Sequence, residues 1–154
     1  MRRFDVETAE EMLARCRELA TDCDIFIACA AVADYRPATV ANQKIKKGGE
    51  TSTLALARNP DIVATIAALP DGPFTVGFAA ETRDVHHYAR DKLTRKGLDM
   101  IVANNVASEG VGFNSDENEV TVFSAAAETG LPRASKAVIA AGIIDLVAAR
   151  LSAE

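Results

Sequence analysis

The chain has 154 residues, of which 49% are hydrophobic and 25% charged, and this composition indicates one globular domain with a sizeable core. No run approaches the roughly 20 apolar residues of a membrane-spanning helix, and the first residues do not resemble a signal peptide, so we expect a cytoplasmic protein without a membrane partner. The formal net charge of −5 argues against nucleic acid as the main partner, although 17 lysines and arginines leave room for a local anion site.

The first predicted element is an amphipathic helix. Thr8 and Glu11 form a capping box, and residues 12–20 place apolar side chains at helical spacing. A buried parallel strand is predicted from Ile25, because the apolar run 25–31 lacks helical spacing and ends in small residues. Ligands of open α/β sheets bind beyond the carboxyl ends of such strands, so the residues that follow this strand are the first place to expect chemistry.

The middle of the chain alternates strands with helices. Residues 53–57 alternate as a short strand, and Asn59 followed by Pro60 predicts the start of a helix that ends near Leu69. A turn then leads into a second buried strand at 74–80.

The alternation continues to the end of the chain. Asp84 is predicted to cap a helix that reaches Lys96 and ends at Gly97, followed by an apolar strand at 98–103. A polar, glycine-bearing loop covers 110–118.

A last strand is expected at 119–123, a turn at 130–132, and a helix capped by Ser135. This order predicts an α/β fold, a Rossmann-like doubly wound sheet in three layers. Such folds normally begin with a strand, whereas this chain begins with a helix.

The three cysteines, Cys16, Cys23 and Cys29, lack the paired spacing of zinc or redox motifs. An odd number also argues against a disulfide framework. We expect reduced thiols that are mostly buried.

Basic residues gather in two places. Lys92 and Lys96 lie four apart, hence on one helix face, where they would either neutralise a polyphosphate or form a solvated basic face. Lys44, Lys46 and Lys47 precede two glycines and form either a movable phosphate-binding flap or an exposed basic turn.

Two further features bear on ligand binding. The helix start at 59–62 offers backbone N–H groups that suit either an anion or an ordinary cap. Three carboxylates near the expected ligand edge, Asp34, Glu81 and Asp116, are candidates to hold a magnesium ion through water, and the sequence does not rank them.

Six motifs occur along the whole chain, and their members are 28–35 (ACAAVADY), 44–47 (KIKK), 59–62 (NPDI), 77–82 (GFAAET), Lys92-x-x-x-Lys96 and 112–116 (GFNSD). Together and in this order they resemble the bacterial phosphopantothenate cysteine ligase family. This family is the phosphopantothenoylcysteine synthetase half of the bifunctional coenzyme A biosynthesis protein.

The resemblance implies a reaction and its partners. In that family 4′-phosphopantothenate is joined to L-cysteine with CTP and Mg²⁺. The pantothenate carboxylate attacks the α-phosphate to give an acyl-cytidylate and pyrophosphate, and the cysteine amine then displaces CMP. The resemblance also implies a homodimer and a fused decarboxylase domain with an FMN site. The motifs of that domain do not occur in this sequence. Relatives outside bacteria use ATP, so the choice of CTP rests on the resemblance.

By match to the family motifs, the resemblance assigns a nucleotide site to Ala28, Cys29, Ala30, Asp34, Lys44, Asn59, Pro60, Asp61, Ile62, Phe78, Lys92 and Lys96. Lys44 matches the catalytic lysine of the family. The metal ligands stay unassigned.

The family's opening motifs, a glycine-bearing strand turn and a Ser-Asn-x-Ser-Ser-Gly segment, do not occur here. We therefore expect residues 1–154 to form a single ligase domain that lacks its N-terminal βα units. Two functions stay open: a ligase that is active only with the missing segment, or a non-catalytic fragment that binds CTP or dimerises.

Overall fold

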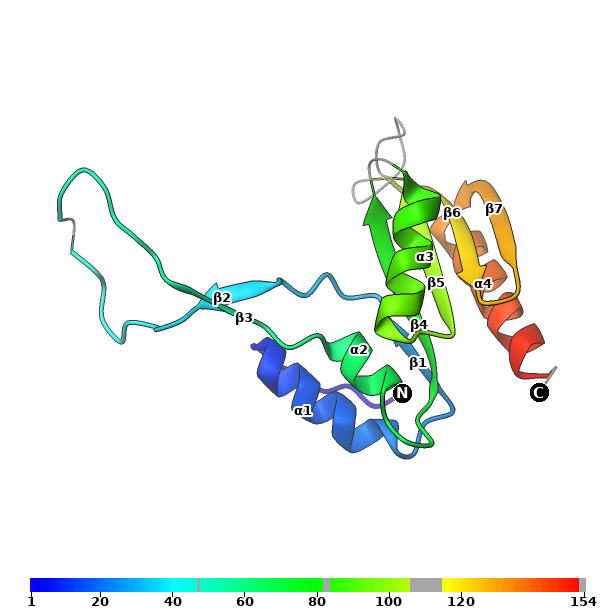
Figure 1. The fold of residues 1–154 in the computed structure, drawn as a ribbon, viewed down its shortest axis with the longest axis horizontal. Helices are drawn as coiled ribbons and strands as arrows, with labels where there is room; N and C mark the ends of the chain where they lie inside the picture. The colour runs from blue at the N-terminus through cyan, green and yellow to red at the C-terminus, as the bar shows by residue number, and fades with distance from the viewer. Residues whose placement is uncertain (47, 82–83, 106–114, 153–154) are drawn as a thin grey trace.

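A five-stranded mixed sheet forms the body of the molecule, with helices on both faces (Figure 1). The computed structural model describes residues 1–46, 48–81, 84–105 and 115–152. The sheet strands are β1 (Ile25–Ala28), β4 (Phe74–Glu81), β5 (Met100–Asn105), β6 (Glu117–Ser124) and β7 (Glu128–Ser135). Their order is β1-β4-β5-β6-β7; the first three are parallel, and the last two form an antiparallel hairpin at one edge.

In the described ranges the helices around this sheet are α1 (Ala9–Ala20), α2 (Ile62–Ala67), α3 (Val85–Lys96) and α4 (Lys136–Leu151). Strand side chains alternate between the two faces, so Val102 packs under α4 whereas Ile101 packs under α3. Helix α1 packs on α2 through a third apolar cluster that includes Phe26 of β1. The Rossmann-like α/β fold expected from the sequence is confirmed. Among the described residues, none of the helices has the length and hydropathy needed to cross a lipid bilayer.

Three predicted helix ends are confirmed. The Thr8 hydroxyl accepts a hydrogen bond from the Glu11 amide at 3.1 Å, and the Glu11 carboxylate accepts one from the Thr8 amide, which completes the capping box of α1. Gly97 ends α3 with φ +65, a left-handed conformation that glycine adopts without strain. The Ser135 hydroxyl accepts from the Val138 amide at the start of α4.

Two local predictions are wrong, and a third holds in position only. Helix α2 begins after Asp61, which is its N-cap, and Asn59 lies outside the helix. Asp84 is the N-cap of α3 as predicted, but its backbone is left-handed with φ 46 and its side chain makes no cap hydrogen bond. The expected turn at 130–132 lies inside β7; this strand tolerates Pro132 because it is at the edge of the sheet.

Strand β1 forms where it was predicted, but it is not buried. It is the outer strand of the sheet, and Ile25 and Ile27 remain 39% and 37% exposed. Ile25 and Ile27 pair with Phe74 and Val76 of β4, whose side chains pack under α4. Helix α4 is centred farther along the sheet, so it does not cover the two isoleucines. An apolar run alone does not distinguish an edge strand from a central one.

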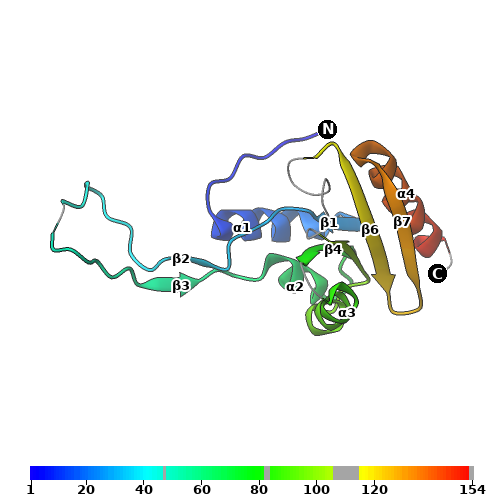
Figure 2. The ribbon, with the colours of Figure 1, turned by 90° about the horizontal axis from the view of Figure 1, so that it is seen from above.

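A long arm made of residues 35–58 leaves the body of the molecule (Figures 1 and 2). At its base, β2 (Tyr35–Pro37) pairs antiparallel with β3 (Leu56–Arg58). Strand β2 was not predicted, and β3 begins later than the predicted strand at 53–57. Lys44 and Lys46 are exposed on the arm, whereas Lys47 lies outside the described residues.

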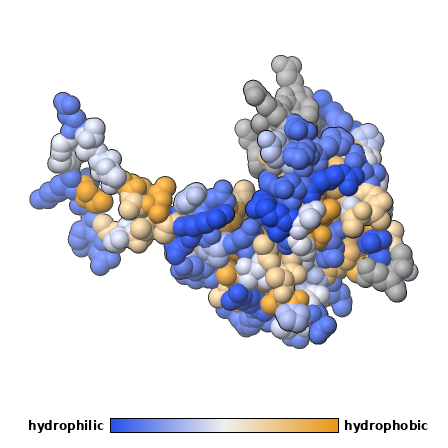
Figure 3. Space-filling model, viewed as in Figure 1, coloured by the Kyte–Doolittle hydropathy of each residue, from blue (hydrophilic) through white to orange (hydrophobic). Residues whose placement is uncertain are grey.

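The arm is also rich in exposed apolar side chains, which colour its surface in Figure 3. They are Tyr35, Val40, Ile45, Leu54 and Leu56, with exposed fractions from 55% to 78%. A two-stranded ribbon is marginally stable by itself in water, so a surface of this kind favours burial against another chain.

Candidate functional site

A cavity of about 460 Å³ lies at the carboxyl end of β1. One wall is the segment 26–34, which runs out of β1, and the opposite wall is 58–63, which leads from β3 into α2. Phe78 of β4 and Lys96 of α3 complete the lining from the sheet and the neighbouring helix. This position agrees with the rule that open α/β sheets bind ligands beyond the carboxyl ends of their strands.

Ten of the twelve residues assigned to a nucleotide site line this one cavity. They are Ala28, Cys29, Ala30, Asp34, Asn59, Pro60, Asp61, Ile62, Phe78 and Lys96. Lys44 and Lys92 are not among the residues that line it: Lys44 is exposed on the arm, and Lys92 is half-buried on α3. The structure therefore brings Lys96 to the cavity but does not bring the three lysines together.

Sequence reasoning missed two contributors from α1. Met12 and Cys16 line the cavity, although their helical spacing predicted only the apolar face of an amphipathic helix. No signal in the sequence separates such residues from core residues, because the same apolar face serves both purposes.

Asn59 joins the two walls of the cavity. Its side-chain amide donates to the carbonyl of Ala33 at 2.8 Å, and its backbone N–H donates to the carbonyl of Asp34 at 2.8 Å. The side chain was expected to cap a helix; it instead sets the distance between the walls. One amide proton of Asn59 is left for a ligand.

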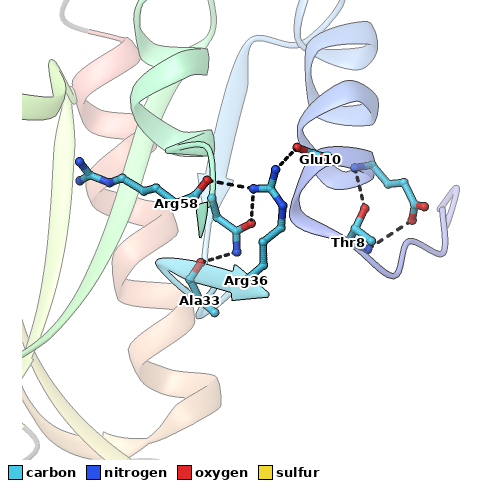
Figure 4. A network of polar contacts seen from close by, with 7 residues as sticks. Thr8, Glu10, Ala33, Arg36 and Arg58 are labelled. Carbon is cyan, nitrogen blue, oxygen red and sulfur yellow. Dashed lines mark hydrogen bonds and ion pairs between the residues drawn. The ribbon is translucent and has the colours of Figure 1, made fainter. Parts of the chain in front are cut away.

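Arg36 fixes the orientation of Asn59 by a hydrogen bond, and Figure 4 shows Arg36 between its labelled partners Arg58 and Glu10. One amino group of its guanidinium donates to Asn59 Oδ1 at 3.0 Å and to the carbonyl of Arg58 at 2.9 Å. The other amino group forms an ion pair with Glu10 of α1. Because Arg36 belongs to β2, this network connects the base of the arm, α1 and the cavity wall.

Asp61 and Lys96 form an ion pair in the lining of the cavity, with Lys96 Nζ 3.0 Å from Asp61 Oδ2. Asp61 Oδ1 also accepts from the Ala64 amide at 3.2 Å, so the start of α2 is capped by its own carboxylate. Partial burial alone would raise the pKa of Asp61. The hydrogen bonds from Lys96 and Ala64, and the positive charges of Lys96 and Arg95, outweigh burial and lower this pKa.

The lowered pKa predicts a pH dependence for the Asp61 carboxylate. Its stabilising contribution is complete above the ordinary aspartate value of 3.8 and is lost as the pH falls through the lower pKa of the folded state. Urea unfolding of the wild type and of Asp61→Asn should therefore differ most at neutral pH and converge in acid. A difference that grows on acidification would contradict this assignment.

The three cysteines are free thiols, as predicted. Cys23 and Cys29 are exposed, however, which corrects the expectation that most would be buried. Cys16 and Cys29 line the cavity, and partial burial raises the pKa of both thiols. Both are therefore neutral at physiological pH and act as small apolar lining.

The carboxylates present fit a magnesium ion only as a partner of bound phosphates. Among the described residues, no three His, Cys, Asp or Glu side chains gather at ligand spacing. Asp34 lines the cavity, whereas Asp116 lies at the start of β6 and is not part of the lining. Magnesium in phosphate sites commonly takes one or two protein carboxylates, and Asp34 and Asp61 are the carboxylates among the described residues that line the cavity. The Glu81 side chain and 112–114 of the last motif lie outside the described structure.

The comparison with known families decides the classification. The model of the family described as the DNA/pantothenate metabolism flavoprotein C-terminal domain matches residues 1–151. The chain belongs to this family. Two proteins similar to this chain are both called coenzyme A biosynthesis bifunctional protein CoaBC. The protein from Vibrio cholerae is 53% identical in an alignment of length 148 that covers 94% of this chain and 37% of the relative. The protein from Escherichia coli K12 is 47% identical in an alignment of length 154 that covers 97% of this chain and 38% of the relative.

Solved structures agree with this classification. The crystal structure of the C-terminal domain of a CoaBC protein superimposes with a TM-score of 0.79 at 32% identity and covers 98% of this chain and 66% of that one. The DNA/pantothenate metabolism flavoprotein from Streptococcus pneumoniae has a TM-score of 0.77 at 19% identity, with 96% and 72% covered, and supports the fold. The family resemblance read from the six motifs is therefore confirmed.

Proposed function

We propose that the cavity at the end of β1 binds CTP, and that the chain supplies the nucleotide site of a ligase that joins 4′-phosphopantothenate to L-cysteine. The supporting observation is the convergence of ten motif residues, from four separate stretches of sequence, on one cavity. The relatives' name, coenzyme A biosynthesis bifunctional protein, agrees with this reaction. We place the reaction in the cytoplasm, in a parent protein that also carries a decarboxylase domain.

The chemistry requires positive charge around two reacting anions. The pantothenate carboxylate attacks the α-phosphorus of CTP, an acyl–phosphate bond forms, and the bond to the leaving pyrophosphate breaks. The cysteine amine then attacks the acyl carbon, CMP leaves, and the nitrogen loses a proton. Lys96 lies in the cavity to stabilise the charge that develops on the phosphates, and Lys92 lies one turn earlier on α3. A bound Mg²⁺ would add charge neutralisation, and Asp34 of the cavity lining would be a protein ligand for it.

Lys44 requires a different explanation because it is on the arm. Its family role is catalytic, yet it does not line the cavity of its own chain. The arm also exposes five large apolar side chains that a second copy would cover. We propose that the chain forms a homodimer through the arm, and that closure of the arm brings Lys44 to a nucleotide. Sedimentation equilibrium checks the dimer: Leu54→Asp with Leu56→Asp should shift it to monomer, and a wild-type monomer would contradict it.

Calorimetric titration with CTP and Mg²⁺ tests the nucleotide site. We expect binding by the wild type and a loss of at least about fivefold in affinity in Lys96→Gln, because one phosphate contact loses its charge. Lys136→Gln is the matched control, since Lys136 is exposed at the start of α4 and does not line the cavity. Equal weakening by both variants would reject the site.

A second assay separates a ligase from a binding module. Pyrophosphate release from CTP should depend on 4′-phosphopantothenate when the chain is joined to the N-terminal part of a ligase domain. Binding of CTP without release in that longer protein would leave the chain as a nucleotide-binding module. Absence of CTP binding at millimolar concentration would leave only the dimerising role.

A further inference from the structure

We propose that the Asp61 carboxylate is an internal counter-ion for the Lys96 ammonium group in the cavity. An incoming phosphate must displace this carboxylate before it can bind Lys96. Asp61 thereby weakens the binding of bare phosphate anions, which have no nucleoside contacts to offset the cost. This inference rests on the proposed function, since it takes the ligand of the cavity to be a triphosphate.

The geometry of the pair is that of an occupied anion contact. Lys96 Nζ lies 3.0 Å from Oδ2 and 3.1 Å from Oδ1 of Asp61, so both carboxylate oxygens face the ammonium group. The Lys96 side chain is only 23% exposed, and it belongs to the lining of the cavity. A phosphate oxygen that binds this ammonium group has to compete with a carboxylate that is already in place.

Asp61 is also held in position from its other side. Its Oδ1 accepts from the Ala64 amide at 3.2 Å, which anchors the carboxylate as the N-cap of α2. The positive charges around it lower the pKa of the Asp61 carboxyl, so the group is ionised at neutral pH. The counter-ion is therefore fixed before any ligand arrives.

An exposed pair on the same helix provides a comparison. On α3, Arg95 Nε lies 3.4 Å from Asp91 Oδ2, and both side chains are more than half exposed. Neither residue lines the cavity. Water and salt screen such a pair, and it competes with no ligand. The position of Asp61 and Lys96 in the cavity is what gives their pairing a consequence for binding.

The cost of displacing Asp61 is the same for every ligand that places a phosphate on Lys96, but ligands differ in what offsets it. Inorganic triphosphate gains only charge contacts, and the Asp61 carboxylate cancels part of that gain. A nucleotide also buries its nucleoside against apolar lining such as Ala30 and Phe78, and that contribution does not depend on Asp61. Binding of bare phosphates is therefore weak, whereas a nucleotide has further contacts that compensate for the counter-ion.

The test is calorimetric titration of the full chain with inorganic triphosphate at low ionic strength. Asp61→Asn removes the charge and keeps an oxygen that can cap α2. We expect this variant to bind triphosphate about two- to fivefold more tightly than the wild type, the range that a partly exposed ion pair supports. Asp91→Asn should leave the affinity unchanged. In the double variant with Lys96→Gln, the gain should disappear.

Three results would overturn the inference: no gain in Asp61→Asn, an equal gain in Asp91→Asn, or a gain that survives removal of Lys96. Failure of the proposed function gives a different pattern. A wild type that binds CTP no more tightly than triphosphate would reject the nucleotide site, even with a gain in Asp61→Asn. Conversely, tight CTP binding without that gain would keep the function and reject the counter-ion.

Discussion

Replacing Lys44 with alanine is expected to abolish pyrophosphate release from CTP without loss of stability. Loss of a charge that stabilises a developing anion typically lowers kcat by about 10²- to 10³-fold. The side chain of Lys44 is exposed on the arm, so its removal exposes no core and leaves no cavity. Stopped-time pyrophosphate assays of the longer protein, together with thermal unfolding of the variant, measure both expectations.

Lys136→Ala is the control for the Lys44 variant. It removes another exposed lysine, at the start of α4 and away from the arm, and should retain wild-type turnover. Undiminished turnover in Lys44→Ala would refute the catalytic assignment. A large drop in its melting temperature would show that the lysine supports the fold instead.

Replacing Phe123 with alanine is expected to lower the free energy of unfolding by about 3–5 kcal/mol. Phe123 has no exposed surface and packs under α3 with Leu93 and Ile101. The His86 ring and the Arg90 guanidinium also lie 5.4 and 5.3 Å from its ring centre, so its loss removes contacts from the helix surface as well. Equilibrium unfolding in urea measures the change.

Phe78→Ala removes the same side chain from a different environment. Phe78 lies in β4, two strands away from β6, is 41% exposed and lines the cavity. We expect a cost of about 1 kcal/mol in stability, together with weaker CTP binding. Equal costs for the two phenylalanines would contradict the burial described for the sheet.

Local signals in the sequence predicted the elements where a short-range contact decides them. The capping box of Thr8 and Glu11, the left-handed Gly97 and the cap at Ser135 are each satisfied within a few residues. The order of strands and helices was therefore readable, and with it the α/β class.

Long-range contacts decided the predictions that failed. Asn59 has the chemistry of an N-cap, but its side chain bonds to Ala33, 26 residues earlier. Strand β2 exists because it pairs with β3, and its own three residues carry no strand pattern. The burial of β1 depends on which strands flank it, which an apolar run does not specify.

The residues of the site could be predicted from the sequence, but their contacts with one another could not. The motifs selected ten residues that meet at one cavity, because motif residues near strand ends meet at one edge of a sheet. The pairing of Asp61 with Lys96 was not predictable, since 35 residues and a whole strand separate them. Nor did the sequence show that the segment carrying Lys44 leaves the body as an arm.

The hydrogen bonds of Arg36 link the base of the arm to the cavity wall. This one guanidinium belongs to β2 and holds both Asn59 and the carbonyl of Arg58, which lie in the cavity wall. If β2 tilts while these bonds stay intact, the wall shifts with it and the width of the cavity changes. By the same linkage, a ligand that fixes the width of the cavity should favour one orientation of β2.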